Sequence, residues 1–145
     1  MTTAIGGEGG FPVPAAGIGE YFATLERQGI SLNFGSYYSE TQARTAVIGP
    51  VARPPTAAEL ARMKALMDTA MRAGAMGMTT ALIYPPSSYA TTAELIEMAR
   101  VMAPYGGISA SHIRGEGGEL LDAFVFGGID IGTIYLQLAL FLEPK

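Results

Sequence analysis

Apolar runs and amphipathic helical patterns alternate along this chain of 145 residues, and that alternation leaves few fold classes open. The run Met76–Tyr84 is apolar, rich in small and β-branched residues, and ends at Pro85-Pro86, which is typical of a parallel strand buried on both faces. One helical pattern precedes it, another follows it, and a shorter apolar run begins at Ile108. The order strand, helix, strand is that of right-handed βαβ units, so the sequence predicts an α/β fold in which parallel strands alternate with helices.

Both of these helices carry a start signal and a stop signal. Thr56 with Glu59, and Thr91 with Glu94, match the capping box. In this motif the side chain of the first residue accepts from the backbone N–H of the second, and the side chain of the second accepts from the backbone N–H of the first. A glycine follows the last periodic residue of each helix, as expected at a helix end. The faces predicted to be buried consist of Leu60, Met63, Met67, Ala70 and Met71 in the first helix, and Leu95, Met98, Ala99 and Met102 in the second.

The amino-terminal part of the chain extends the same alternation. Thr2–Ile5 predicts the end of a strand, and the periodicity from Ile18 to Leu25 predicts a short amphipathic helix. A strand with aromatic residues is expected over Ile30–Tyr38, and a second short helix over Thr41–Ile48.

The only histidine of the chain, His112, stands where the run from Ile108 gives way to a glycine-rich stretch at 115–118. It would lie at the carboxyl end of a parallel strand, which is where ligands and chemistry collect in parallel α/β folds. A single histidine is weak ground by itself, since a hydrogen-bonded structural histidine or an exposed loop histidine is the plainer interpretation. The loop GGEGG at 6–10 lacks the lysine and hydroxyl of a phosphate loop, so phosphate binding is not supported.

Composition and charge argue against several classes of function. The formal net charge is −4 and no basic cluster occurs, which argues against a nucleic-acid partner. Cysteine is absent, which excludes disulfides and fits a cytoplasmic protein, and the first residues do not have the pattern of a signal peptide. The stretch Ala123–Leu142 has the length of a membrane span, but Asp130 and three glycines favour a helix end followed by a buried strand.

Three motifs occur in order: AIGGEGGFPVP at 4–14, a long segment at 54–108 that contains YPP and ATTAEL, and SASHIRGEGG at 109–118. Over about Thr2 to Ala123 they resemble the N-acyl-D-amino-acid deacylases (D-aminoacylases), a branch of the metal-dependent amidohydrolase superfamily. The resemblance implies a partial (β/α)8 TIM-type barrel, with residues 1–130 as about the second to fifth β/α units and 131–145 as a divergent apolar tail. A complete barrel typically needs about 250 residues, which is more than this chain has.

The resemblance also implies a site. His112 would be a zinc ligand at the end of the fifth barrel strand, and Glu8 would be the carboxylate that ligates or bridges metal. Ile83 and Tyr84, after the fourth strand, would line the pocket for the substrate side chain. Two plainer interpretations stay open, namely that Glu8 is a solvated loop acid and that Tyr84 is ordinary packing at the barrel rim. Two residues of the SASHIRGEGG motif would position its loop: Arg114 and Glu116.

In this family, zinc activates a water for attack on an amide, and a carboxylate passes a proton to the leaving amine. The family's H-x-H pair and its proton-shuttling aspartate would fall before and after this chain, and the second histidine expected near Leu142 is missing. We therefore expect a fragment of a zinc-dependent hydrolase of N-acyl-D-amino acids that binds zinc weakly or not at all and is inactive alone. The open strand edges of a partial barrel also predict self-association. The alternative is a non-catalytic α/β interaction module or pseudoenzyme that self-associates.

Overall fold

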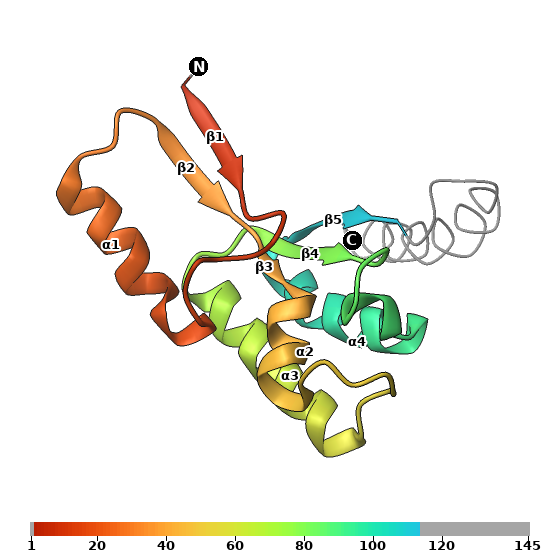
Figure 1. Cartoon of the computed structure of the whole chain (residues 1–145). Coiled ribbons are helices and arrows are strands. Elements are labelled where there is room, and N and C mark those ends of the chain that lie inside the picture. Colours follow the sequence, from red (N-terminus) through yellow and green to blue (C-terminus); the bar gives the residue numbers. More distant parts are fainter. Residues whose placement is uncertain (1, 114–145) are drawn as a thin grey trace, which may run out of the picture.

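The computed structural model describes residues 2–113, in which a layer of strands is backed by helices (Figure 1). No helix in this part of the chain combines the length and the apolar character needed to cross a membrane. The helices and strands are β1 Thr3–Gly6, α1 Ile18–Gln28, β2 Asn33–Ser36, β3 Tyr38–Ser39, α2 Glu40–Ile48, α3 Ala57–Arg72, β4 Gly77–Ala81, α4 Thr92–Met102 and β5 Ile108–His112, with short 3-10 turns at Ala15–Gly17, Ser87–Tyr89 and Ala103–Tyr105.

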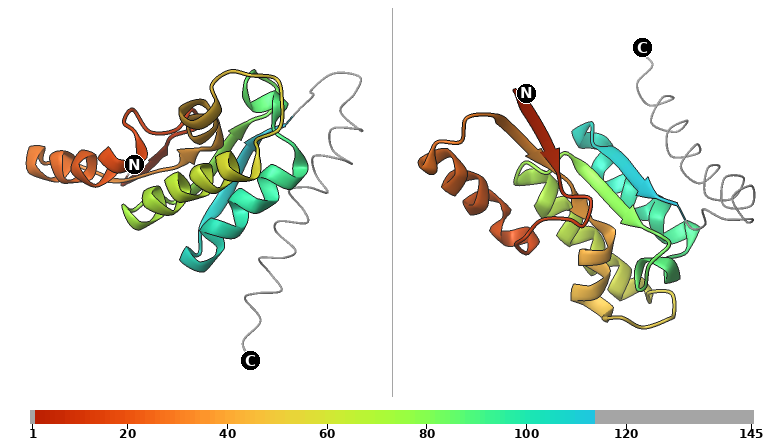
Figure 2. Two further views of the ribbon diagram at one scale, coloured as in Figure 1. Left: turned by 90° about the horizontal axis from the view of Figure 1, so that it is seen from below. Right: turned by 45° about the horizontal axis from the view of Figure 1, so that its top comes forward.

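All strand pairs in the described residues are parallel, and the strands point the same way in Figure 2. β1 pairs with β2, while β4 pairs with β3 on one side and with β5 on the other. The N–H of Met76 donates to the carbonyl of Ser36 at 2.9 Å and so ties the end of β2 to the segment that leads into β4. The predicted α/β fold with parallel strands is confirmed, and no barrel closes within residues 2–113.

Two predicted strands are shorter than their apolar runs. The strand expected over Ile30–Tyr38 forms as the separate strands β2 and β3, and the strand expected over Met76–Tyr84 ends at Ala81. After Ala81 the chain turns, and the N–H of Tyr84 donates to the Ala81 carbonyl at 2.9 Å. The apolar character past the strand end serves a small separate core, which consists of Leu82, Ala90 and Leu95.

Both long helices begin where the sequence predicts. α3 starts after Thr56, whose hydroxyl accepts from the Glu59 N–H while the Glu59 carboxylate accepts from the Thr56 N–H, so this capping box is complete. α4 starts after Thr91, whose hydroxyl accepts from the Glu94 N–H. The reciprocal half predicted for α4 is wrong, because the Glu94 carboxylate turns inward and forms a buried ion pair with Arg44.

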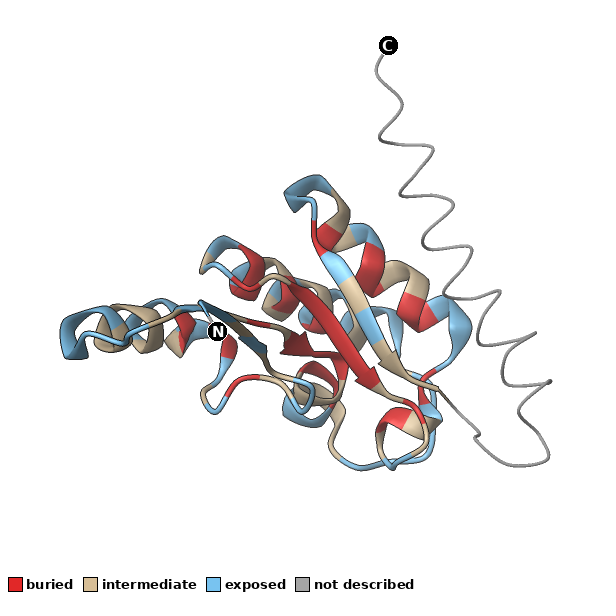
Figure 3. Ribbon diagram, turned by 90° about the horizontal axis from the view of Figure 1, so that it is seen from above, coloured by how far each residue is buried: buried red, intermediate tan, exposed pale blue. Residues whose placement is uncertain are grey.

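Methionine side chains fill much of the space between the strands and the helices. Met63 and Met67 of α3 and Met98 and Met102 of α4 are fully buried, as their helical spacing predicts. Burying one such side chain stabilises the fold by about 1.5–3 kcal/mol. Figure 3 shows the result: buried residues follow one side of α3 and of α4 and run along β4, whereas every position of β5 is exposed or intermediate.

Gly77 fixes how closely β4 and β5 approach each other. Its φ is +149°, and a Cβ atom on Gly77 would lie 1.8 Å from the carbonyl oxygen of Ile108, so no other residue fits without moving the strands. Gly77 stands opposite Ile108 in the register, and the same register places Ala81 opposite His112 at the other end of the pair. The close approach at Gly77 thus acts at the start of β5, and the register that it favours places His112 at the other end of the strand.

Candidate functional site

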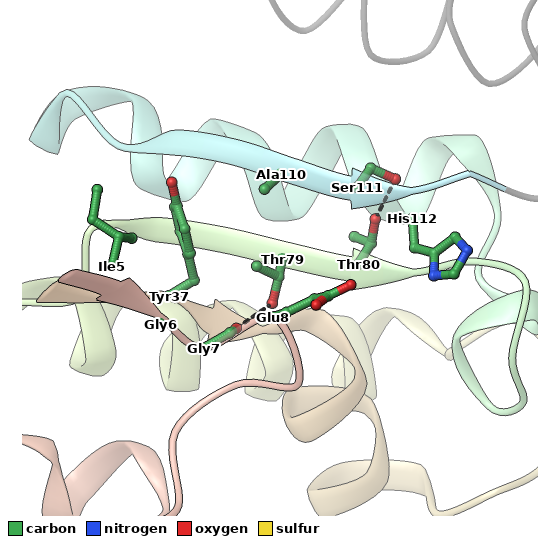
Figure 4. A pocket seen from close by; sticks show the side chains of 10 residues that line it. All are labelled: Ile5, Gly6, Gly7, Glu8, Tyr37, Thr79, Thr80, Ala110, Ser111 and His112. Carbon is green, nitrogen blue, oxygen red and sulfur yellow. Dashed lines mark hydrogen bonds between the residues drawn. The ribbon is translucent and has the colours of Figure 1, made fainter.

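An open pocket of about 600 Å³ lies over the strands, toward their carboxyl ends (Figure 4). The glycine-rich loop that follows β1 forms one wall, and residues of β4 and β5 form the floor and the other wall. Glu8 follows β1 and His112 ends β5, so the two residues come from opposite ends of the described chain. Both line this one pocket. The structure thus brings together the two residues that the resemblance assigns to metal, while their role as metal ligands stays a prediction.

The loop that carries Glu8 is held in place by its backbone. The N–H of Gly10 donates to the Gly7 carbonyl at 2.8 Å, and the hydroxyl of Thr79 on β4 donates to the same carbonyl at 3.1 Å. Gly7 has a φ of +88°, and a Cβ there would lie 2.3 Å from the Ser36 Oγ, so the loop needs glycine at this place. With the loop fixed in this way, the Glu8 side chain extends along β4 toward His112 (Figure 4).

His112 is the last residue of β5 and is partly exposed at the mouth of the pocket. Its carbonyl accepts from the N–H of Leu82 at 2.9 Å, which continues the strand pairing one step past the end of β4. The Tyr84 ring meets the imidazole edge to face, with the ring centroids 5.4 Å apart and the planes at 87°. Strand pairing thus fixes the backbone of His112, and the Tyr84 ring packs against its imidazole.

The other predicted site residues differ in where they lie. Tyr84 is at the rim beside His112 and is 58% exposed, so its ring is available to a ligand. Neither Tyr84 nor Ile83 is among the residues that line the pocket. Tyr84 reaches its edge through the ring contact with His112, whereas Ile83 is half-buried, so their predicted place in a substrate pocket stays a prediction. Arg114 and Glu116, predicted to position the loop after β5, lie outside the described residues.

Several pocket residues were not predicted from the sequence. Thr80 on β4 donates its hydroxyl to the Ser111 Oγ on β5 at 2.7 Å, and Tyr37 lines the pocket from the break between β2 and β3. Threonine and tyrosine are common in and near strands and serine is common anywhere on a protein surface, so nothing in the local sequence marks these residues as pocket-lining. The pocket floor therefore carries hydroxyl groups that can donate to or accept from a polar ligand.

Imidazole nitrogen and carboxylate oxygen are donors of the kind that zinc uses. Zinc sites in proteins have three or four protein ligands, whereas residues 2–113 hold no group of three histidine, cysteine, aspartate or glutamate side chains that converge on a metal position. Glu8 and His112 thus fit zinc in their chemistry and fall short of it in number. Further donors would have to come from outside the described residues or from another chain.

Comparison with curated proteins gives relatives of one kind, and no family model matches the sequence. The chain is 36% identical over 104 residues to a D-aminoacylase of Alcaligenes xylosoxydans xylosoxydans, an alignment that covers 72% of the chain and 22% of the relative. It is 38% identical over 97 residues to an N-acyl-D-glutamate deacylase of the same organism, which covers 67% of the chain and 20% of the relative. The chain therefore spans about a fifth of the length of these relatives.

Solved structures with the same arrangement have related names. A crystal structure of D-aminoacylase, described as defining a subset of amidohydrolases, matches with a TM-score of 0.81 and 28% identity over 96% of this chain and 33% of its own. The N-acyl-D-glutamate deacylase of Bordetella bronchiseptica, solved with zinc and a phosphonate that mimics the tetrahedral intermediate, matches with a TM-score of 0.79 and 30% identity. That match covers 92% of this chain and 32% of the deacylase.

Proposed function

This chain belongs, as a partial sequence, to the family of N-acyl-D-amino-acid deacylases, and from that premise we propose that it is one section of a zinc-dependent hydrolase. The bond broken is the amide that joins an acyl group to a D-amino acid, the substrate class in the names of the relatives. The observation that supports this assignment best is that Glu8 and His112, donors from opposite ends of the described chain, line one pocket at the carboxyl ends of parallel strands. A TIM-type barrel collects its catalytic residues at that rim.

Each residue then has a defined task. Glu8 and His112 would hold metal from two sides of the pocket, and zinc, when bound, would polarise the amide carbonyl and lower the pKa of a bound water to about 7. Tyr84 keeps the imidazole oriented and offers its exposed ring to the substrate side chain. Arg114 and Glu116 would position the loop that follows His112, and Ile83 would join Tyr84 beside the substrate side chain.

The same premise extends to the architecture. We assign four successive strands of a (β/α)8 barrel, the second to the fifth, to β1, to β2 continued by β3, to β4 and to β5. Residues 1–130 would then be the barrel section and 131–145 a divergent tail. In the described residues, β1 and β5 are edge strands, and edges of this kind are templates for pairing with another chain. Self-association of the chain and a cytoplasmic location remain predictions from the sequence.

The two-donor pocket also favours a second candidate function. A chain that lacks a complete set of donors in residues 2–113 can act as a non-catalytic α/β module that pairs through its strand edges. The two functions differ in their dependence on His112, because a module needs the strand and not the imidazole.

A chimera tests the proposed function directly. Residues 2–113 of this chain replace the matching section of the Alcaligenes D-aminoacylase, and hydrolysis of N-acetyl-D-amino acids is measured with zinc present. We expect an active chimera that loses hydrolysis with His112→Ala and is strongly impaired by Glu8→Ala. The matched control is Glu26→Ala, which removes an exposed carboxylate of α1 away from the pocket and should leave hydrolysis unchanged. A folded, zinc-loaded chimera whose hydrolysis survives His112→Ala would refute the assignment.

A further inference from the structure

A buried group of charged and hydroxyl side chains lies below the rim and belongs neither to the apolar core nor to the pocket. Arg44 and Glu40 come from α2, Glu94 from the first turn of α4, and Ser87 from the loop between β4 and α4. All four residues are between 0 and 2% exposed. Charged side chains are almost never buried to this degree without partners, so the group requires a physical account. We call these four residues the Arg44 cluster.

Arg44 is the centre of the cluster. Its Nη1 donates to both carboxylate oxygens of Glu94 at 2.7 Å, and its Nη2 donates to the backbone carbonyls of Arg53 at 2.5 Å and Val51 at 3.3 Å. One guanidinium therefore joins α2 to the start of α4 and to the segment between α2 and α3. Such a buried charge with several bonds gives a fixed geometry, since removing one partner leaves the other uncompensated.

Glu40 is the second carboxyl in the cluster, and its protonation state decides its bonds. Burial raises the pKa of Glu40 to about 8, and the nearby charge of Glu94 adds to the rise, so Glu40 is mostly protonated at neutral pH. As a carboxylate, Glu40 would leave its Oε1 buried without a hydrogen-bond partner. As a carboxylic acid, it has a proton to donate on that side, while its Oε2 accepts from the Ser87 hydroxyl at 2.8 Å.

The bond between Ser87 and Glu40 anchors the loop that carries Tyr84. Within that loop the N–H of Ser88 donates to the Tyr84 carbonyl at 2.9 Å, and the N–H of Ala90 donates to the Ser87 carbonyl at 3.0 Å. At the start of the loop, Leu82 donates its N–H to the carbonyl of His112. The loop is thus fastened to His112 at one end and to Glu40 at the other.

Tyr84 itself has little packing to hold its ring. It is 58% exposed, and the ring contact that the structure gives it is the edge contact with His112. We propose that Glu40 and Ser87 are positioning residues, which hold the loop so that the Tyr84 ring stays against the His112 imidazole. This inference rests on the proposed function for the use of His112 and Tyr84, whereas the positioning itself is a matter of local geometry.

The single histidine provides a direct measurement of that geometry. The imidazole proton resonances of His112 in the full chain, labelled at histidine, respond to the ring current of an aromatic ring at this distance, and Tyr84→Ala gives the reference for its loss. Labelling of one residue type is usable in solution for a small assembly and by magic-angle spinning for a large one, so association of the chain does not prevent the measurement. The readout needs neither metal nor hydrolysis.

Ser87→Ala removes the hydroxyl donor and should shift the His112 resonances in the same direction as Tyr84→Ala, by most of its size. Glu40→Gln keeps an oxygen that accepts from Ser87 and should leave the resonances near those of the parent chain. Thr69→Ala is the matched control, because it also deletes one bonded hydroxyl, that to the Ala65 carbonyl on the exposed side of α3. If Ser87→Ala does not fold by circular dichroism, Glu40→Met, which fills the space without an acceptor, takes its place against Glu40→Gln.

The inference would be overturned if the His112 resonances of Ser87→Ala, or of Glu40→Met, coincided with those of the parent chain while Tyr84→Ala shifted them. So would a shift from Glu40→Gln as large as that from Tyr84→Ala. Failure of the proposed function would be seen separately, as an active chimera indifferent to His112→Ala, and would leave these spectra unchanged.

Discussion

Replacing Glu40 by glutamine should stabilise the chain, and the gain should grow with pH. The carboxyl of Glu40 titrates near 4.5 when exposed in the unfolded chain and near 8 when buried in the fold. Between these two values the folded chain binds a proton that the unfolded chain has released, so the free energy of unfolding falls as the pH rises. Below about pH 4.5 both states are protonated and this contribution to stability is complete; above about pH 8 it is fully lost.

The size of the effect follows from the same two pKa values. Each pH unit between them costs about 1.4 kcal/mol, and pH 7 lies about 2.5 units above the pKa of the unfolded carboxyl, so the loss at pH 7 is at most about 3.5 kcal/mol. Glutamine has no proton to take up, and its side-chain oxygen can still accept from Ser87. Glu40→Gln should therefore unfold at a higher urea concentration than the parent chain near pH 7 and at a similar concentration near pH 4.5.

Urea unfolding followed by tyrosine fluorescence, from about pH 5 to about pH 8, measures the difference in the free energy of unfolding. Glu26→Gln is the matched control, since it makes the same chemical change at an exposed position of α1 and should give a difference that is small at every pH. A Glu40→Gln chain that is less stable than its parent at pH 7, or whose advantage does not change with pH, would show that Glu40 is ionised in the fold.

Four further outcomes are expected. Arg44→Ala should cost roughly 3–5 kcal/mol of stability, because it leaves Glu94 buried and unpaired, whereas Arg27→Ala, which removes an exposed ion pair with Glu20, should cost about 0–1 kcal/mol in the same urea assay. The purified chain should not retain one zinc per chain after dialysis at neutral pH, by metal analysis; retention would mean that a further donor exists beyond Glu8 and His112. Light scattering should report an oligomer or aggregate, and N-acetyl-D-amino acids with added zinc should show no measurable hydrolysis by the isolated chain.

Local sequence patterns predicted the helices well and failed where a distant residue decided the outcome. Thr56 and Thr91 stand three residues before a glutamate, and both start a helix. Only Glu59 completes the capping box, because Glu94 has a buried partner, Arg44, 50 positions earlier in the chain. The pattern at a helix start contains no information about such a partner, so the two glutamates cannot be told apart from their local sequence.

The strand ends show the same limit in another form. Leu82 continues the apolar run of β4, which predicts strand, yet the chain turns after Ala81 and Leu82 packs with the loop and α4. Hydrophobicity reports burial and does not report which core a residue enters. This matters for the site, because the turn is what brings Tyr84 back beside His112 and leaves Ile83 away from the pocket.

The sequence singles out Glu8 and His112 of the candidate site but not the hydroxyl residues beside them. Glu8 stands alone in a glycine loop and His112 is the only histidine, so each can be singled out from the sequence. Thr80 and Ser111 have residue types common in strands, and their place on the pocket floor depends on the pairing of β4 with β5. That pairing depends in turn on the close approach at Gly77, which only three-dimensional packing reveals.

The strand edge beside His112 links association of the chain to its metal chemistry. Within the described residues β5 pairs with β4 alone, so its other edge presents backbone groups next to the pocket. A parallel strand that pairs with this edge ends at the same rim and brings its own side chains beside His112. Within the described residues, Glu8 and His112 are fewer donors than a zinc site needs. The strand that pairs with the free edge of β5 is also the strand placed to supply further donors. Zinc should therefore increase the average mass of the purified chain in light scattering, and His112→Ala should remove this increase while leaving the association seen without zinc. An equal response to zinc in the parent chain and in His112→Ala would separate association from the metal site.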